Sequence, residues 1–167
     1  VQDKGYKFRI TLDHSHVIFK IDNPEEQKIF NIDKDINDGK LILDPYEEEN
    51  ICDQWIKSNF IHHMHARSTI PNNPKNIYAQ HPDGSMGRGI QYPFVKPLPG
   101  QYYEKWDKKL LDRWKLVVQS IVDHHYSNKG SFLEQITTEF IAPTDYGAGW
   151  NYSIFNNVIF IIIAICD

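Results

Sequence analysis

Three histidines stand close together in the segment Phe60–Arg67, whose sequence is FIHHMHAR. Successive side chains of a β-strand point to opposite faces, so we expect His63 and His65 on one face and His62 on the other. A histidine pair on one face, where a strand gives way to a loop, is suited to bind a metal ion or a sugar. The alternative is a partly buried, hydrogen-bonded histidine cluster with a structural role only.

Two other predicted strands end in residues that could share this chemistry. The segment Lys7–Leu12 is rich in β-forming residues and is followed by Asp13, and the segment Gln135–Phe140 carries Glu139 near its carboxyl end. The carboxyl ends of parallel strands meet at one rim of a sheet, so Asp13, His65 and Glu139 could converge there. One histidine and two carboxylates suit a divalent cation such as Mn²⁺, Mg²⁺, Co²⁺ or Zn²⁺.

The segments between these strands are predicted to be helical. Asn23 and Pro24 are a typical helix start, and Asp44 is expected to start a second helix that runs to about Ser58. The segment Asp107–His125 is the clearest helix, because apolar residues recur along it at helical spacing with charged residues opposite. Strand, loop and helix therefore alternate, which is typical of a parallel sheet with helical crossovers, an α/β fold.

A long section at residues 68–105 is dense in proline, glycine and asparagine, and we expect it to be irregular. A loop of this length inside a compact domain usually has a function. Its tyrosine and phenylalanine residues argue against disorder. We therefore expect an ordered lid or a wall that faces the substrate.

Composition limits the class of protein. The 167 residues, 41% of them hydrophobic, indicate one soluble domain with a core of its own. A net charge of -4 argues against nucleic acid as a partner, since phosphate binding needs clustered Lys and Arg. Cys52 and Cys166 form no disulfide framework, so we expect the reducing cytoplasm. The apolar stretch Val158–Cys166 is too short to span a bilayer, and no membrane partner is expected.

The ordered set of motifs resembles the xylose isomerase-like TIM-barrel superfamily, which includes sugar epimerases and sugar phosphate isomerases. In that family one strand ends in an Asp-x-x-His motif, which Asp13 and His16 match. The next strand carries a metal-binding histidine in an H-x-H setting, which His63 and His65 match. The last strand carries a glutamate that binds the metal and moves a proton, which Glu139 matches.

A further motif of the family is a Gly-Arg-Gly run followed by a proline next to an aromatic residue. Gly87-Arg88-Gly89 and Tyr92-Pro93-Phe94 match it. The resemblance implies that Arg88, Arg67, His63 and His16 contact the sugar.

The resemblance also implies a metal cofactor and a reaction. Asp13, His65 and Glu139 would hold the divalent ion, with Mn²⁺ expected first. Glu139 and His16 would be the catalytic residues in the isomerisation or epimerisation of a sugar or sugar phosphate. Proton transfer would take place beside a metal-bound carbonyl.

The implied fold is the carboxyl-terminal part of a (β/α)8 barrel, with three or four βα units in a single domain at residues 1–167. A full barrel takes about 250 residues. The family's second metal-binding glutamate lies on an earlier strand that this sequence does not contain. We therefore expect either a fragment or a barrel completed by another polypeptide, in a homo-oligomer or with a second chain.

Several alternatives stay open. The chain could be a sugar-binding remnant without catalysis, or a C-glycoside-cleaving lyase subunit of the same superfamily. A phosphodiesterase similar to endonuclease IV would need more ligands and a basic face for DNA. A cupin would need a glutamate soon after the histidines, and residues 66–74 contain none.

Overall fold

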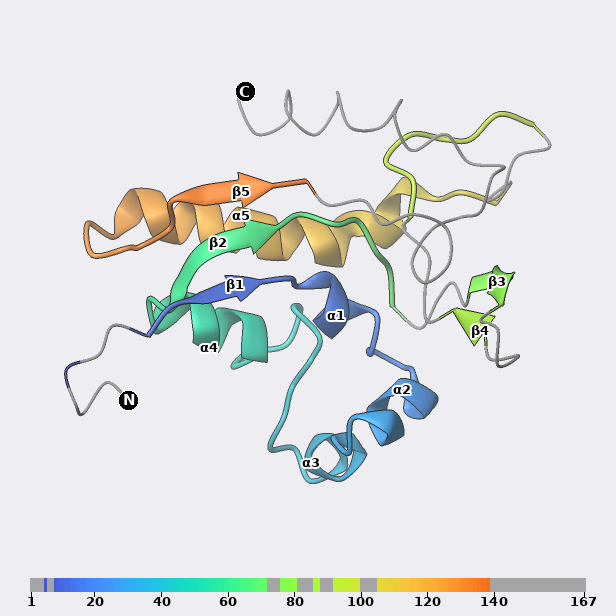
Figure 1. Ribbon diagram of the computed structural model, residues 1–167, viewed down its shortest axis with the longest axis horizontal. Helices are drawn as coiled ribbons and strands as arrows, with labels where there is room; N and C mark the ends of the chain where they lie inside the picture. Colours follow the sequence, from blue (N-terminus) through green and yellow to red (C-terminus); the bar gives the residue numbers. More distant parts are fainter. Residues whose placement is uncertain are drawn as a thin grey trace.

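The structure is a computed structural model, which describes residue 5 and residues 8–71, 76–80, 86–87, 92–99 and 105–138. Three short strands form a parallel sheet in the order β1-β2-β5 (Figure 1). They are β1 (Ile10–Leu12), β2 (Ile61–His65) and β5 (Gln135–Thr137). Their order in space follows their order in the chain, so each crossover joins neighbouring strands.

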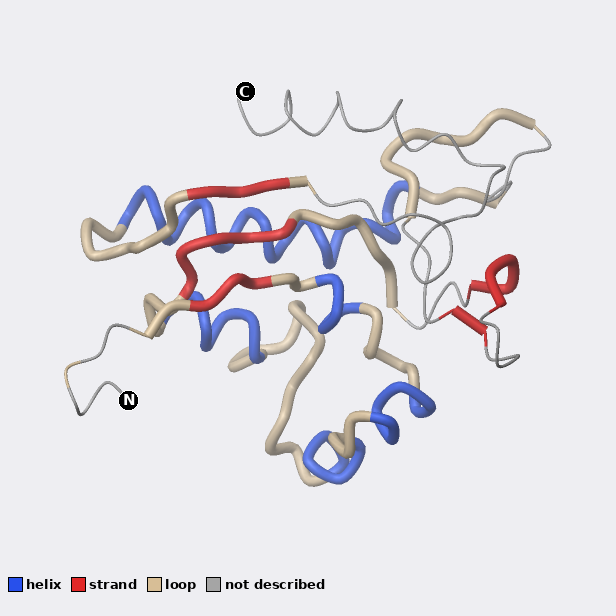
Figure 2. The backbone as a smooth tube through the Cα atoms, in the orientation of Figure 1, coloured by secondary structure: helices blue, strands red, loops and turns tan. Residues whose placement is uncertain are grey.

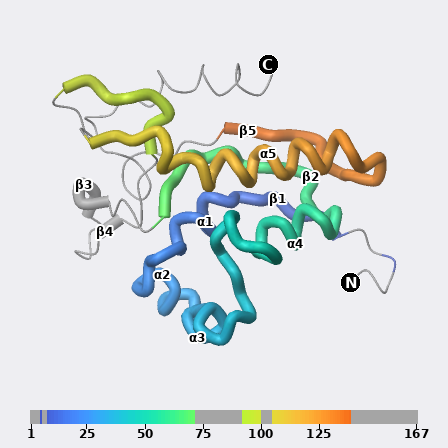
Figure 3. Tube along the Cα trace, turned by 180° about the vertical axis from the view of Figure 1, so that it is seen from behind, coloured from blue at the N-terminus to red at the C-terminus, as the bar shows by residue number. Residues whose placement is uncertain are grey.

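A helix lies in each crossover, and both helices cover the same face of the sheet (Figures 1 and 3). Helix α4 (Ile51–Lys57) precedes β2, and α5 (Asp112–Ser127) precedes β5 after a 3-10 turn, η2 (Lys108–Leu111). The α/β prediction with helical crossovers is confirmed in this three-stranded form. A closed barrel stays a prediction.

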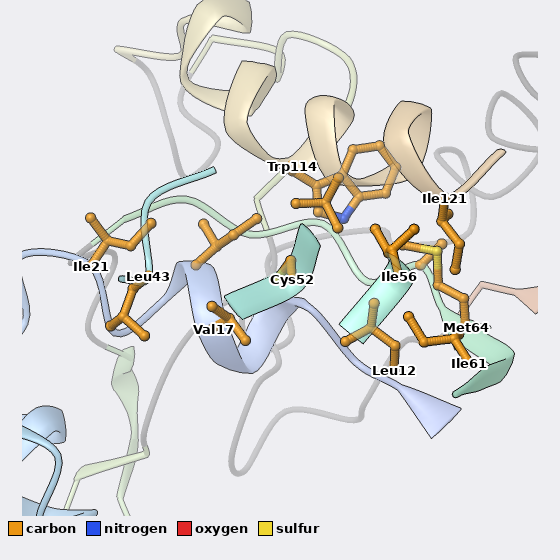
Figure 4. Packing of buried hydrophobic residues seen from close by; sticks show 13 residues of the cluster. Leu12, Val17, Ile21, Leu43, Cys52, Ile56, Ile61, Met64, Trp114 and Ile121 are labelled. Carbon is orange, nitrogen blue, oxygen red and sulfur yellow. The ribbon is translucent and has the colours of Figure 1, made fainter. Parts of the chain in front are cut away.

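The core lies between this face of the sheet and the two helices (Figure 4). Leu12 and Met64 are 2% and 0% exposed and pack with Trp114 of α5 and Ile56 of α4. Cys52 of α4 is fully buried among them, and burial raises the pKa of its thiol to about 12. This cysteine is therefore an unreactive core residue.

The pairing of β1 with β2 has one irregularity, which changes the expected alternation. The register shifts between Ile10 and Thr11, so that β2 contains one additional residue at this point. As a result Ile61 and Met64, three positions apart, both reach the core. Simple alternation does not hold at the start of β2.

Three short helices lie between β1 and α4, in the first crossover: α1 (Ser15–Ile18), α2 (Pro24–Ile29) and α3 (Asp33–Asn37). The predicted start of α2 is confirmed, because the Asn23 side chain accepts a hydrogen bond from the Glu26 backbone N–H at 3.4 Å. Residues 30–32 separate α2 from α3. The chain leaves it through Gly39, whose φ of 69° suits glycine.

The helix predicted to start at Asp44 starts seven residues later. Both Asp44 oxygens accept hydrogen bonds from Arg113 at 2.8–2.9 Å, which holds this carboxylate against α5. The buried Asn50 caps α4 instead, because its side chain accepts from the Asp53 backbone N–H at 3.0 Å. Residues 45–49 form turns.

The section at residues 68–105 is not irregular throughout. It contains the antiparallel pair β3 (Asn76–Gln80) and β4 (Met86–Gly87) (Figure 2). In the sequence, β3 falls between Pro74 and Pro82. The density of proline in this section therefore concealed a short strand between two of the prolines.

Candidate functional site

The predicted site residues lie at the carboxyl ends of the three strands. Leu12 of β1 pairs with Met64 of β2, so the next position along each strand is Asp13 and His65. His65 in turn pairs with Thr137 of β5. The structure thus brings Asp13, His65 and the end of β5 to one rim of the sheet.

Asp13 is held by contacts to both of its carboxylate oxygens. Oδ1 accepts from the Ser15 backbone N–H at 3.2 Å and from the Ser15 hydroxyl at 2.5 Å. Oδ2 accepts from Arg67 Nη2, and His16 Nε2 lies 3.5 Å from the same oxygen. A metal ion bound to Asp13 would therefore share Oδ2 with a guanidinium group.

The ion pair between Asp13 and Arg67 is almost completely enclosed. The Asp13 side chain is 14% exposed and that of Arg67 only 3%. The Arg67 backbone carbonyl accepts a hydrogen bond from Trp114 Nε1 at 2.7 Å. This contact connects the pair to α5, so the end of β1, the exit of β2 and the long helix meet at one point.

His63 is fixed by a hydroxyl on each neighbouring strand. Its Nε2 lies 2.8 Å from Thr137 Oγ1, and its Nδ1 lies 3.4 Å from Thr11 Oγ1. The rings of His63 and His65 meet edge to face with centroids 4.7 Å apart, so the two are on one face as predicted. A sugar that binds His63 would replace one of the threonine contacts.

His62 takes no part in this pair. Its Nδ1 lies 3.1 Å from the Ile10 carbonyl oxygen, on the neighbouring strand. The contact joins β2 to β1 at the register shift. We assign it a structural role.

The side chain of His16, a predicted catalytic residue, is 39% exposed. It borders a groove of about 580 Å³ that runs along β1. Asp13 and Lys20 also line this groove, whose remaining wall is mainly apolar and includes Phe30 and Trp55. Lys20 Nζ donates to the His16 carbonyl at 2.7 Å and lies 4.2 Å from the centroid of the Phe30 ring.

His14 is a residue of the site that the sequence analysis did not select. It is 0% exposed, its ring centroid lies 5.6 Å from that of Trp114, and neither ring nitrogen has a hydrogen-bond partner within the described residues. Burial lowers its pKa from 6.5 to about 3, with the Arg67 charge adding to the effect and nearby backbone of Trp114 and His65 opposing it. Leu12 is buried, and side chains two positions apart point to the same face of a strand, so the sequence contained a signal that His14 is buried.

Two predicted site residues, Glu139 and Arg88, lie outside the described residues. In the part of the chain that the structure describes, no three His, Cys, Asp or Glu side chains are grouped as a metal site. Metal binding by Asp13, His65 and Glu139 stays a prediction.

Comparison of the chain with family models, curated proteins and solved structures finds no match. The resemblance to the xylose isomerase-like superfamily rests on the sequence motifs. Among the described helices, none has the length and apolar character that crossing a membrane requires.

We predict that Arg67→Met lowers the free energy of unfolding by about 3 kcal/mol, because it leaves the enclosed Asp13 carboxylate without its guanidinium partner. The matched control is Arg9→Met, since Arg9 pairs with the exposed Glu134 at 2.7 Å. Loss of that pair should cost less than about 1 kcal/mol. Urea unfolding of both variants measures the difference, and equal costs would contradict the account.

We predict that His14 makes stability depend on pH. The pKa of His14 is lower in the folded protein than in the unfolded chain, so the unfolded chain binds the proton at a higher pH. The free energy of unfolding therefore decreases as the pH falls from 6.5 toward 3. The slope from this one group is about 1.4 kcal/mol per pH unit. His14→Phe should remove this slope from unfolding curves across that range, whereas parallel dependence in both proteins would contradict it.

Proposed function

We propose that the chain carries the metal and sugar-binding rim of a divalent-metal-dependent sugar or sugar phosphate isomerase or epimerase. One observation carries the proposal. Asp13 directly follows β1 and His65 ends β2, so the two residues lie at the same end of adjacent parallel strands. Strand β5 ends two residues before Glu139 in the sequence. Functional residues in α/β barrels lie at this end of the strands.

Asp13, His65 and Glu139 would hold the ion, and Mn²⁺ is the ion we propose first, with Mg²⁺, Co²⁺ and Zn²⁺ as alternatives. When bound, the cation supplies Lewis-acid polarisation of a sugar carbonyl. The donor set fits a hard or borderline divalent ion, since it consists of two carboxylates and one imidazole.

Side chains of this chain would transfer the proton, contact the sugar and stabilise developing charge. Glu139 would act as one acid/base group at the carbon beside the carbonyl, and the family's second glutamate would act as the other. His16, at the groove, contacts a sugar hydroxyl. Arg67 already lies against Asp13 and would stabilise negative charge that develops on the substrate oxygens, with Arg88 as a further contact.

The fold that this function requires is a barrel that this chain completes together with another polypeptide, in a homo-oligomer or with a second chain. The described sheet supports the proposal in two respects. Its strands are parallel and sequential, and the crossover helices lie on one face. The face opposite the helices carries Thr11, His63, His65 and Thr137, which are polar and at least partly exposed.

A sugar-binding module without catalysis is the second candidate. The observation that favours it is the state of Asp13, whose two oxygens already have partners in Ser15 and Arg67. A carboxylate with these contacts can fix the loop after β1 without a metal. A C-glycoside-cleaving lyase subunit would use the same rim and is included in the substrate assay below.

The test is Mn²⁺ affinity together with sugar isomerisation and glycoside cleavage, for His65→Ala and Glu139→Gln. We expect Mn²⁺ affinity to fall at least about tenfold in His65→Ala. The control His62→Ala removes a neighbouring histidine that contacts the β1 backbone, and should bind Mn²⁺ like the unchanged protein. Sugar binding with no turnover would favour the binding module. Unchanged Mn²⁺ affinity and turnover in both site variants would overturn the proposal.

A further inference from the structure

Strand β1 is an edge of the described sheet, and its outward backbone groups are open. The Ile10 backbone N–H donates to the Phe60 carbonyl at 2.8 Å, so the peptide groups of Ile10 face β2. Peptide groups alternate sides along a strand, and those of Thr11 therefore face away from the sheet. Thr11 is exposed, and β2 is the one strand neighbour of β1 in the described sheet, so the outward N–H and C=O of Thr11 have no ladder partner there.

Apolar surface flanks this open edge. The groove of about 580 Å³ begins at Ile10, Thr11 and Leu12 and extends past the half-exposed Phe30. An edge with unpaired peptide groups beside apolar surface is a template for pairing with another strand. The edge and the groove thus mark one surface for association.

The sequence of this edge is complementary to itself when two copies run antiparallel. A two-fold axis at Thr11 places Thr11 opposite Thr11 of the other copy, and the two residues can exchange both N–H···O=C bonds. The same register places Ile10 opposite Leu12 and Arg9 opposite Asp13. Apolar residues then face apolar residues, and opposite charges face each other twice.

We propose that β1 is a self-association edge, at which two copies of this chain pair antiparallel about Thr11 into one six-stranded sheet. The symmetric, closed arrangement is that of most homodimers. The Arg9 guanidinium can take part because its present partner, Glu134, is 64% exposed, and such surface pairs contribute little. Asp13 keeps its bond to Arg67 on its own chain.

This pairing goes beyond the proposed function and does not depend on it. The antiparallel arrangement leaves the Asp13 and His65 rims of the two copies at opposite ends of the common sheet. A parallel strand that completed a barrel would need the same edge of β1. Self-association and completion by another polypeptide are therefore mutually exclusive states of this surface.

The first test compares Thr11→Pro with Thr11→Val by sedimentation equilibrium over a wide concentration range. Proline removes the outward N–H, while β1 keeps the backbone bonds of Ile10 to β2. Valine also removes the hydroxyl contact to His63 but keeps the N–H, which makes it the matched control. We expect the unchanged protein and Thr11→Val to dimerise, and Thr11→Pro to dimerise at least about 30-fold more weakly, since two hydrogen bonds are lost.

The second test reverses the charge of Arg9, whose side chain pairs with the exposed Glu134. Arg9→Glu places like charges opposite each other twice and should weaken the dimer about tenfold. Glu134→Lys breaks the same intramolecular pair but leaves the Arg9–Asp13 contacts, so it should dimerise normally. This comparison holds even where Thr11→Pro folds poorly.

Amide hydrogen exchange of the unchanged protein supplies an independent readout. The Thr11 amide should be protected at high protein concentration and exchange freely on dilution. A protein that stays monomeric at high concentration would overturn the proposal. So would a dimer whose Thr11 amide is unprotected, since that dimer must use another surface. Mn²⁺ binding and isomerisation are separate readouts, which keeps this outcome distinct from failure of the proposed function.

Discussion

The ion pair between Asp13 and Arg67 is the contact on which the geometry of the rim depends. Asp13 directly follows β1, and Arg67 lies two residues after β2. Their side chains meet in a nearly enclosed position. Two charges removed from water are stable there only with further hydrogen bonds, and Ser15 supplies these to Asp13. Trp114 fixes the Arg67 backbone from α5. The ends of two strands and one helix are thereby held in a single arrangement.

The sheet around this pair has two faces of different character. One face carries Leu12 and Met64 and is covered by α4 and α5. The other carries threonine and histidine side chains that contact one another across the three strands, as in the His63–Thr137 and His63–Thr11 contacts. A parallel sheet usually has both faces covered. In the barrel that we propose, this polar face would line the interior.

Sequence reasoning located the three strands, the capped start of α2 and the long amphipathic helix, because periodicity and capping are local signals. It placed the start of α4 at Asp44, since a local pattern does not reveal that Arg113, distant in the sequence, binds this carboxylate. The register shift between β1 and β2 was also invisible, because it arises from pairing between strands. His14 was not selected, although its place two residues after the buried Leu12 was a local signal for its burial.

The candidate site was predictable to the extent that strand ends could be found from sequence. Asp13 and His65 lie at one rim, as expected from parallel strands. The contacts that occupy them, from Ser15 and Arg67 to Asp13, depend on the conformation of the loops after β1 and β2, for which the sequence offers no periodic signal. These contacts decide how readily Asp13 can accept a cation.

The most direct measurement of the central claim is paramagnetic broadening of NMR signals by substoichiometric Mn²⁺ in the unchanged protein. The account predicts that broadening is strongest at Asp13, His65 and Glu139 together, and weak at the distant His124 and His125 at the end of α5. Broadening centred on α5, or signals at Asp13, His65 and Glu139 that stay sharp, would contradict a common metal rim.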